Sequence, residues 1–319
     1  MPSITQAFVL GAGLGTRLRP LTEDLPKPLV PIFQKPLITF ALDHLIYTGC
    51  TTFTVNTHHA PERFGEAFPN ATYDGFPLHF RHEPGLLETG GGIVNVADLL
   101  GDKPFLVYNA DILSDLPLEP LIEEHVRSGN MVTLALRSHA GPQHVAFDRA
   151  THRVVDIRNL AGTGARDEFI FAGIYVVQPE FMKLLHPGEK RSVIPTFVEM
   201  IKDGAKLGGA VIDEGYWWDV GTRESYLQLH RDLPELDFPR YPTRDRHWCA
   251  TVHPTARMAE GVELRGCSVV SAGANIGAGA ILEDSLVWRG AEVAAHSHLS
   301  NCVVRMNRKA EGILRDADL

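Results

Sequence analysis

Residues 8–31 combine closely spaced glycines with basic side chains. An apolar run ends at Leu10, and alternating glycines follow it, Gly11, Gly13 and Gly15. Glycine lets backbone N–H groups approach a ligand, and successive exposed N–H groups form a concave anion site. Arg17 follows at once, and Lys27 stands ten residues later between two prolines. A turn of amides with two cations predicts a loop that binds a triphosphate.

Two other phosphate-binding motifs do not fit this loop. A Walker A loop ends in Gly-Lys-Ser/Thr, whereas here Gly15-Thr16 is followed by Arg17. A dinucleotide fingerprint needs a small residue where Thr16 stands and an acid at the end of the second strand, where this chain has Asn56. A plain glycine turn is the alternative without a ligand, and the nearby Arg17, Lys27 and prolines argue against it.

Two aspartates follow predicted strands and are candidate metal ligands. Asp111 ends the run Asn109-Ala110-Asp111 after an apolar strand over 105–108. Ligands of open α/β sheets bind at the carboxyl ends of strands, and Mg²⁺ takes one or two protein carboxylates. Asp219 follows two adjacent tryptophans, which suit a sugar platform. The alternative role of Asp111 is an Asx turn or helix cap, and a helix over 223–229 would be capped by Thr222 or Asp219.

Apolar periodicity predicts the elements that position these residues. We expect strands over 7–10, 53–55, 78–80, 105–108, 131–136 and 169–177, and a hairpin with arms 145–147 and 154–157. We expect helices over 37–47, 62–68, 93–99, 121–127, 179–185, 193–202 and 223–229. The alternation of strands and helices indicates a mostly parallel sheet with helices on both faces.

The last part of the chain has a different pattern. Apolar residues stand six positions apart at Val252, Met258, Leu264, Val270, Ile276, Leu282 and Trp288. The residues four positions after each are mostly small. This period predicts a hexapeptide β-helix of roughly three coils. Such a short helix usually packs on the first domain or on another subunit, so a homo-oligomer is one expectation.

Composition limits the classes of function. The 319 residues carry a net charge of −9, which argues against a nucleic-acid partner. No stretch approaches the ~18 apolar residues of a transmembrane helix, and the N-terminus lacks a signal-peptide pattern. The four cysteines are scattered and fit a reducing cytoplasm. We therefore expect a cytoplasmic protein with domains over 1–233 and 249–319, joined by a Pro-rich linker over 234–248.

The run Gly-Ala-Gly-Leu-Gly-Thr-Arg-Leu-Arg-Pro-Leu-Thr, followed by Pro-Lys-Pro-Leu, resembles the signature of sugar-1-phosphate nucleotidyltransferases, the NDP-sugar pyrophosphorylases. The later Trp-x-Asp-x-Gly-Thr resembles a second signature of that family. The resemblance implies a Rossmann-like, mostly parallel α/β nucleotidyltransferase domain plus a short C-terminal left-handed β-helix of hexapeptide repeats. It also implies a Mg²⁺-dependent reaction in which an NTP and a sugar 1-phosphate give an NDP-sugar and pyrophosphate.

The resemblance also assigns roles to residues of this chain. Arg17, Lys27 and Asp111 would be catalytic, and Asp111 and Asp219 would hold the metal. Nucleotide-binding residues would be Leu10, Gly11, Ala12, Gly13, Gly15, Thr16, Arg17, Lys27, Glu88, Thr89, Gly90 and Asn109. Sugar-binding residues would be Asn159, Gly173 and Trp217. The chain departs from the family at Ala110, usually a glycine, and at Arg158-Asn159, where many relatives have Glu-Lys-Pro.

The sequence points to more than one substrate and function. Residues 87–93 resemble the N-acetylmuramate-1-phosphate uridylyltransferases and slightly favour UTP. The β-helix tail favours mannose- or heptose-1-phosphate guanylyltransferases. One rival function is acetyl transfer by the tail, with His296 or His298 as a base, although ordinary surface histidines explain both. Another is a regulatory subunit that binds nucleotide sugars without making them, against which the intact candidate catalytic residues argue.

Overall fold

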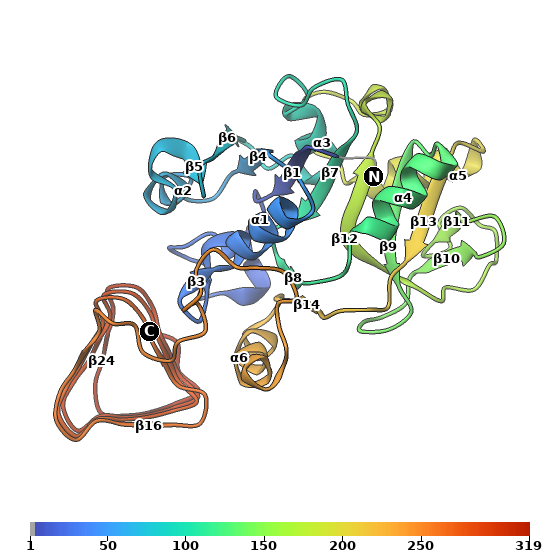
Figure 1. Cartoon of the computed structure of the whole chain (residues 1–319). Helices are drawn as coiled ribbons and strands as arrows, with labels where there is room; N and C mark the ends of the chain where they lie inside the picture. Colours follow the sequence, from blue (N-terminus) through green and yellow to red (C-terminus); the bar gives the residue numbers. More distant parts are fainter. Residues whose placement is uncertain (1–3) are drawn as a thin grey trace. The chain divides into compact units, whose positions relative to one another are not determined.

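The computed structural model describes residues 4–319, which form two compact units (Figure 1). The first unit contains residues 4–14, 40–218 and 239–242, and the second contains 15–39, 219–238 and 243–319. Both units are discontinuous along the chain. Two of their boundaries fall inside the glycine-rich loop and directly before Asp219. The division into continuous domains over 1–233 and 249–319 stays a prediction.

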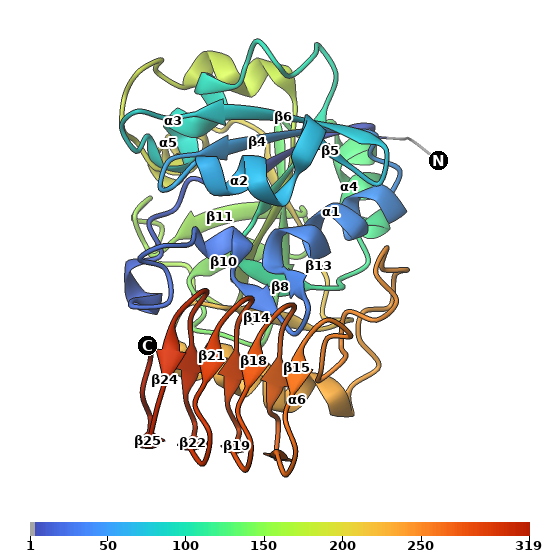
Figure 2. The same ribbon diagram turned by 90° about the vertical axis from the view of Figure 1, so that its left-hand side faces the viewer.

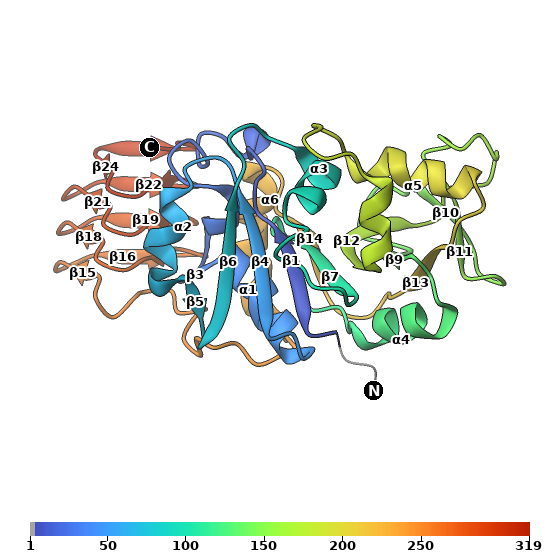
Figure 3. The same ribbon diagram turned by 90° about the horizontal axis from the view of Figure 1, so that it is seen from above.

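A ten-stranded mixed sheet forms the centre of the first unit, in the order β10-β11-β13-β9-β12-β7-β1-β4-β6-β5. The central strands β7, β1, β4 and β6 are parallel (Figure 3), which confirms the predicted α/β fold. The strand β12 runs antiparallel to both β7 and β9. The strands are β1 (Gln6–Leu10), β4 (Thr52–Thr57), β5 (Thr72–Tyr73), β6 (Phe76–His82), β7 (Phe105–Asn109), β9 (Val132–Arg137), β10 (Val145–Asp148), β11 (Arg153–Ile157), β12 (Ile170–Val177) and β13 (Leu207–Val211).

Helices cover both faces of this sheet. The helices are α1 (Leu37–Tyr47), α2 (Glu62–Ala67), α3 (Glu88–Asn95), α4 (Glu119–Ser128) and α5 (Val193–Lys202), with a 3-10 helix over Pro179–Leu184. On one face, Ile93 of α3 and Phe197 of α5 join a core with Leu134 of β9. On the other face, His125 of α4 lies 2.9 Å from the Thr133 hydroxyl. Because side chains alternate along a strand, Thr133 and Leu134 point to opposite faces.

The bounds of α1 and α5 agree with the predicted ranges, but those of α3 do not. The sequence predicts a helix over 93–99, whereas α3 begins at Glu88 and includes three glycines. Glycine is a poor helix former, so periodicity alone places the start too late. The amides of Gly90 and Gly91 both donate to the carbonyl of Arg191 (2.9 and 3.1 Å). These tertiary contacts offset the low helix propensity.

The tail forms a β-helix in the second unit, as predicted, with short parallel strands stacked on successive coils (Figure 2). One face consists of β15 (Arg257–Met258), β18 (Asn275–Ile276), β21 (Glu292–Val293) and β24 (Lys309–Ala310). A second consists of β16 (Glu263–Arg265), β19 (Ile281–Glu283), β22 (His298–Ser300) and β25 (Ile313–Arg315). The third consists of β17 (Val269–Val270), β20 (Leu286–Val287) and β23 (Val303–Val304).

The predicted apolar row of the tail is correct as far as Leu282 and wrong at Trp288. The coils shorten after the first: Met258 pairs with Ile276, eighteen residues on, but Ile276 pairs with Val293, seventeen residues on. Val287 therefore pairs with Val270, in the place that the six-residue period gives to Trp288. The Trp288 indole instead donates to the hydroxyl of Tyr226 (3.2 Å).

The second unit also contains the helix α6 (Arg223–Asp232) and the hairpin β2 (Pro31–Ile32)–β3 (Lys35–Pro36). The Gln34 side chain, at the turn of this hairpin, donates to the carbonyls of Ala250 (2.8 Å) and Val270 (3.2 Å). These bonds fix the hairpin to the first coil of the β-helix. Across residues 4–319, every helix is too short or too polar to cross a lipid bilayer.

Candidate functional site

Three neighbouring strands of the first unit end at the same edge of the sheet. Leu10 at the end of β1 is in register with Asn56 of β4 and Asn109 of β7. Asp111 lies in the turn between β7 and β8 (Ile112–Ser114), and Ala110 N donates to Leu10 O (3.1 Å). The turn thus holds Asp111 beside the start of the glycine-rich loop. A strand follows Asp111, so it is not a helix cap.

A buried hydrogen-bond network connects that loop to the segment before α3. The Asn56 amide oxygen accepts from Gly11 N (2.8 Å), and its Nδ2 donates to Glu83 Oε1 (2.7 Å). Glu83 Oε2 accepts from Leu87 N (2.9 Å). Asn56 and Glu83 are 1% and 0% exposed. The sequence analysis missed both as site residues. Their only signal was a polar side chain at or just after the end of a strand.

Several candidate nucleotide-binding groups already have partners inside the protein. The amides of Gly11 and Gly90 donate to Asn56 and Arg191, and the Thr89 hydroxyl accepts from Val193 N (2.8 Å). Glu88 Oε1 lies 4.0 Å from the Lys190 ammonium. Gly13 differs, because a Cβ added there would meet no atom within 4 Å. The open backbone for a ligand is therefore around Gly13.

Replacing Glu83 by glutamine is expected to destabilise the first unit and to weaken nucleotide binding. The variant keeps the size of the side chain, but one carboxylate oxygen becomes an NH₂ group that cannot accept from Asn56 or Leu87. Leaving a buried donor unsatisfied costs about 1–3 kcal/mol. Denaturant unfolding measures the stability, and KM for the nucleotide measures the second effect. Glu66→Gln, at an exposed ion pair with Arg63, is the control. An unchanged unfolding midpoint for Glu83→Gln would contradict the role of the network.

Two of the three sugar-binding candidates come together in the first unit. Gly173 has a φ of 77° at an irregularity in the pairing of β12 with β9, and a Cβ there would lie 2.8 Å from Asn109 Nδ2. Trp217 lies in β14 (Trp217–Asp219) and donates its indole N–H to the carbonyl of Ala172 (2.9 Å), the residue before Gly173. Asn109, Gly173 and Trp217 therefore surround one end of β12.

The third sugar-binding candidate, Asn159, lies in an exposed loop after β11. Its amide oxygen accepts from Gly164 N (3.2 Å). The loop is organised by the buried carboxylate of Asp156, which accepts from Ala161 N and from the amide and hydroxyl of Thr163. Burial raises the pKa of Asp156, but these hydrogen bonds outweigh it and hold the pKa below its ordinary value. Asp156 therefore stays ionised and fixes the loop.

The segment that leads into the two tryptophans is held by buried charged side chains. Arg137 is 2% exposed. Its guanidinium donates to the carbonyls of Ile212, Asp213, Glu214 and Gly215. The Asp115 carboxylate accepts from Tyr216 N and from Arg240 N. Burial raises the pKa of Asp115 and lowers that of Arg137. The sequence analysis missed both residues, because a single charge beside an apolar strand gives no distinctive pattern.

The second unit brings together the remaining charged candidates. Asp219 Oδ2 lies 3.5 Å from Arg17 Nη2, and Asp219 Oδ1 lies 3.6 Å from Lys27 Nζ. The Lys27 side chain is 7% exposed, whereas that of Arg17 is 66% exposed. A Cβ at Gly221 would lie 3.0 Å from Arg17 Nη2, so glycine leaves room for the guanidinium. Thr222, not Asp219, caps α6, through a capping box with Ser225.

Gly15 shapes the turn that presents Thr16 and Arg17. Its φ is 61°, a left-handed conformation that favours glycine. An added Cβ would lie 3.0 Å from Thr22 Cγ2 and 3.2 Å from Lys27 Cβ. The Thr22 hydroxyl donates to Gly15 O (2.8 Å). A 3-10 turn over Thr16–Leu18 follows and leaves the Arg17 side chain in solvent. Glycine at position 15 thus allows the left-handed turn and its close packing against Thr22 and Lys27.

Comparison with known proteins shows the family to which this chain belongs. Residues 6–235 match the family model "Nucleotidyl transferase". Mannose-1-phosphate guanylyltransferase of Mycobacterium tuberculosis (strain ATCC 25618 / H37Rv) is 33% identical, over 91% of this chain and 81% of the relative. Mannose-1-phosphate guanylyltransferase 1 of Arabidopsis thaliana is 27% identical, over 94% and 83%. A structure of UDP-glucose pyrophosphorylase complexed with UDP-glucose covers 73% of this chain and 99% of its own, with a TM-score of 0.60 and 18% identity. The chain therefore belongs to the nucleotidyl transferase family and is a sugar-1-phosphate nucleotidyltransferase.

Proposed function

We propose that this enzyme joins GTP and mannose 1-phosphate to give GDP-mannose and pyrophosphate. The observation that carries the proposal is the 33% identity to a bacterial relative of that name over 91% of the chain. Relatives from Oryza sativa and Drosophila melanogaster bear the same activity in their names and match 94% of the chain. These comparisons support the predicted guanylyltransferase alternative better than the uridylyltransferase prediction.

The glycines that favoured UTP have another explanation. Gly90 and Gly91 donate to Arg191 O, and a Cβ at Gly91 would lie 2.3 Å from Glu189 O. A Cβ at Gly92 would lie 2.9 Å from Asn56 Nδ2. Close packing within the first unit therefore accounts for this run of glycines. The run of glycines is therefore weaker support for UTP than its resemblance to the uridylyltransferases suggests.

The proposed reaction is an in-line displacement at the α-phosphorus of the nucleotide. An oxygen of the sugar phosphate forms the new bond to this phosphorus as the bond to pyrophosphate breaks. Positioning and charge stabilisation dominate such transfers, so the protein supplies no covalent nucleophile. The exposed Arg17 would hold the departing pyrophosphate, since a planar guanidinium suits two phosphate oxygens. The largely buried Lys27 would lie beside the α-phosphate as a point charge.

Mg²⁺ would be held by Asp111 and Asp219, and when bound it would neutralise charge on the phosphate oxygens. The donor chemistry fits, because Mg²⁺ binds one or two carboxylates and completes its shell with water and phosphate. The Asp219 side chain is 42% exposed, and its oxygens lie 3.5 Å from Arg17 Nη2 and 3.6 Å from Lys27 Nζ. Within residues 4–319, no three His, Cys, Asp or Glu side chains converge as a larger metal cage would require.

The test is a panel of substrates with pyrophosphate release as the measurement. GTP, UTP, ATP, CTP and dTTP are each combined with Mg²⁺ and with mannose, heptose, glucose or N-acetylmuramate 1-phosphate. GTP with mannose 1-phosphate is expected to react fastest, and EDTA is expected to stop the reaction. UTP with N-acetylmuramate 1-phosphate as the fastest pair would overturn the substrate assignment. Binding without release of pyrophosphate from any pair would favour the regulatory subunit.

The predicted homo-oligomer is tested separately, by light scattering.

A further inference from the structure

The terminal coil of the β-helix contacts the loop that carries Arg17. We call residues 15–25 the Arg17 loop. Arg305 Nη1 donates to Pro20 O (2.8 Å) and to Glu23 Oε2 (2.9 Å), while its Nε donates to Leu319 O (2.9 Å). Arg308 Nη2 donates to Asp24 Oδ2 (2.9 Å). One guanidinium therefore joins the loop to the last residue of the tail, and all of these groups lie in the second unit.

The Arg17 loop is held together by internal hydrogen bonds and buried leucines, so a restraint on one part should act on the rest. Leu18 N donates to Gly15 O (2.9 Å), and Glu23 N donates to Pro20 O (3.1 Å). Leu18 and Leu21 are fully buried, and they flank the contacted Pro20. Arg17 itself lies in the 3-10 turn that directly precedes this anchored part. Holding Pro20 therefore also limits where the Arg17 backbone can move.

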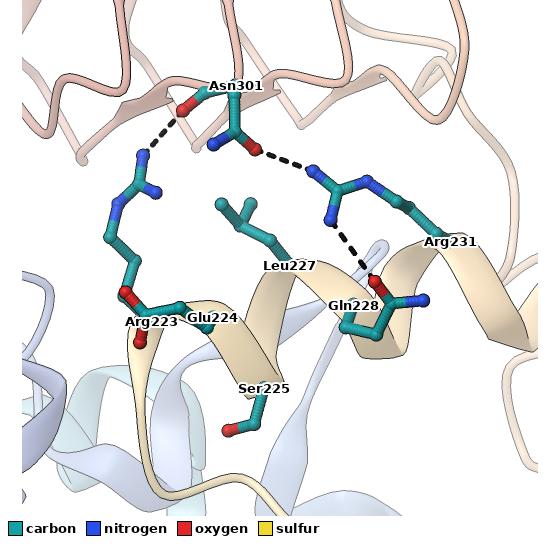
Figure 4. Close-up of a pocket in the computed structure, with 7 residues that line it drawn as sticks. All are labelled: Arg223, Glu224, Ser225, Leu227, Gln228, Arg231 and Asn301. Atoms are coloured by element: carbon teal, nitrogen blue, oxygen red, sulfur yellow. Dashed lines mark hydrogen bonds between the residues drawn. The ribbon is translucent and has the colours of Figure 1, made fainter.

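The same end of the tail also holds the element that follows Asp219. Arg223, the first residue of α6, donates through Nε to both Asp318 oxygens (2.8 Å each) and through Nη2 to Asn301 O. Figure 4 shows Arg223 and Arg231 reaching from α6 to opposite sides of Asn301, around a pocket of about 370 Å³. Val220, Gly221 and Thr222 connect Asp219 to this anchored helix. The tail is thus attached on both sides of the Arg17–Asp219 pair.

We propose that Arg305 is a positioning residue for the transferase reaction. Through its fork it fixes the Arg17 loop against the terminal coil, so that Arg17 meets the triphosphate in one orientation. The kinetic part of this proposal rests on the proposed function, whereas the structural part does not. The tail then has a role in catalysis without a catalytic group of its own.

The carbonyl contacts of Arg305 matter more than its ion pairs. Glu23 and Asp24 have side chains that are 51% and 56% exposed, and exposed ion pairs contribute little and are screened by salt. The Arg305 side chain is 11% exposed, and its fork reaches Pro20 O and Leu319 O in different directions. A lysine ammonium at this position is a point charge without such a fork. Lysine should therefore not replace arginine.

The test compares Arg305→Ala and Arg305→Lys with Arg265→Ala in the full-length protein. Arg265 is the matched control, because its guanidinium pairs with Glu263 on the tail itself. We expect kcat to fall about tenfold or more in both Arg305 variants, with KM for the sugar 1-phosphate unchanged, since small misplacements of binding groups have effects of this size. Hydrogen exchange at residues 16–25 should quicken in both variants. Arg265→Ala should match the wild type in each measurement.

Each result decides for or against the proposal. Wild-type kcat in both Arg305 variants would overturn it, as would an equal loss in Arg265→Ala. If Arg305→Ala does not fold, Arg305→Lys decides, with a lowered kcat in support and a wild-type kcat against. If the wild type releases no pyrophosphate with any pair, the proposed function fails. Hydrogen exchange then decides the anchoring alone, and an unchanged rate at residues 16–25 would overturn it.

Discussion

Replacing Asp219 by asparagine is expected to lower kcat by about 10²- to 10³-fold, the usual effect of removing one preorganised charged contact. Asparagine keeps the size of the side chain but removes its charge. The variant would lose a proposed Mg²⁺ ligand and the carboxylate that lies 3.5 Å from Arg17 and 3.6 Å from Lys27. Arg17 and Lys27 would each lose the attraction of this carboxylate. Steady-state pyrophosphate release over a range of Mg²⁺ concentrations measures the effect.

The folded state of this variant should remain close to that of the wild type. The Asp219 side chain is 42% exposed, and its pair with the exposed Arg17 contributes about 0–1 kcal/mol, whereas its pair with the largely buried Lys27 adds a larger share. A loss of activity can therefore be separated from unfolding by comparing denaturation midpoints. Asp98→Asn is a suitable control, because Asp98 also pairs with an arginine, Arg81, but lies outside the candidate site. Near-wild-type turnover of Asp219→Asn at every Mg²⁺ concentration would refute the proposed metal role.

Local sequence patterns predicted the elements that have a regular apolar face. The helices α1 and α5 have clear apolar periodicity, and their bounds agree with the predicted ranges. The run of glycines in α3 has low helix propensity and is held by contacts to Arg191, about 100 residues away, so no local rule could find its start. Trp288 illustrates a different limit. A strict period cannot show where one coil becomes a residue shorter, and only the pairing of Val270 with Val287 reveals it.

The charged residues of the candidate site were predictable, because each belongs to a short motif and its side chain suits one chemical role. Arg17 and Lys27 were predicted from one motif and Asp219 from a second motif far along the chain, and the second unit places the three together. The groups that support the site were not predictable, because they act through pairs distant in sequence. Neither Asn56 nor Glu83, taken alone, forms a sequence pattern that predicts a role in the site. Their function follows from a buried contact between the ends of two different strands.

The role of Arg137 was also not predictable from local sequence. Its replacement is expected to cause the largest change in the free energy of unfolding. Replacing it by leucine should lower the free energy of unfolding by about 3 kcal/mol or more, because it removes several hydrogen bonds from a charged donor, each worth about 1.5–3 kcal/mol. Its guanidinium donates to four successive carbonyls, from Ile212 to Gly215. Leucine fills most of the volume but provides no donor, and the buried carbonyl of Ile212 left without one costs about 1–3 kcal/mol by itself.

The loss should extend from stability to activity, because the segment over 212–216 leads directly into Trp217. Denaturant unfolding followed by tryptophan fluorescence measures the first effect, and pyrophosphate release measured well below the unfolding midpoint measures the second. Arg137→Lys should be intermediate, since a lysine keeps the charge but cannot reach four carbonyls with a planar fork. Arg166→Leu is the control, because that side chain is 84% exposed and should shift stability by no more than about 0.5 kcal/mol. An Arg137→Leu protein that unfolds at the wild-type midpoint would show that the four carbonyls find other donors, and the buried arginine would then have no structural role.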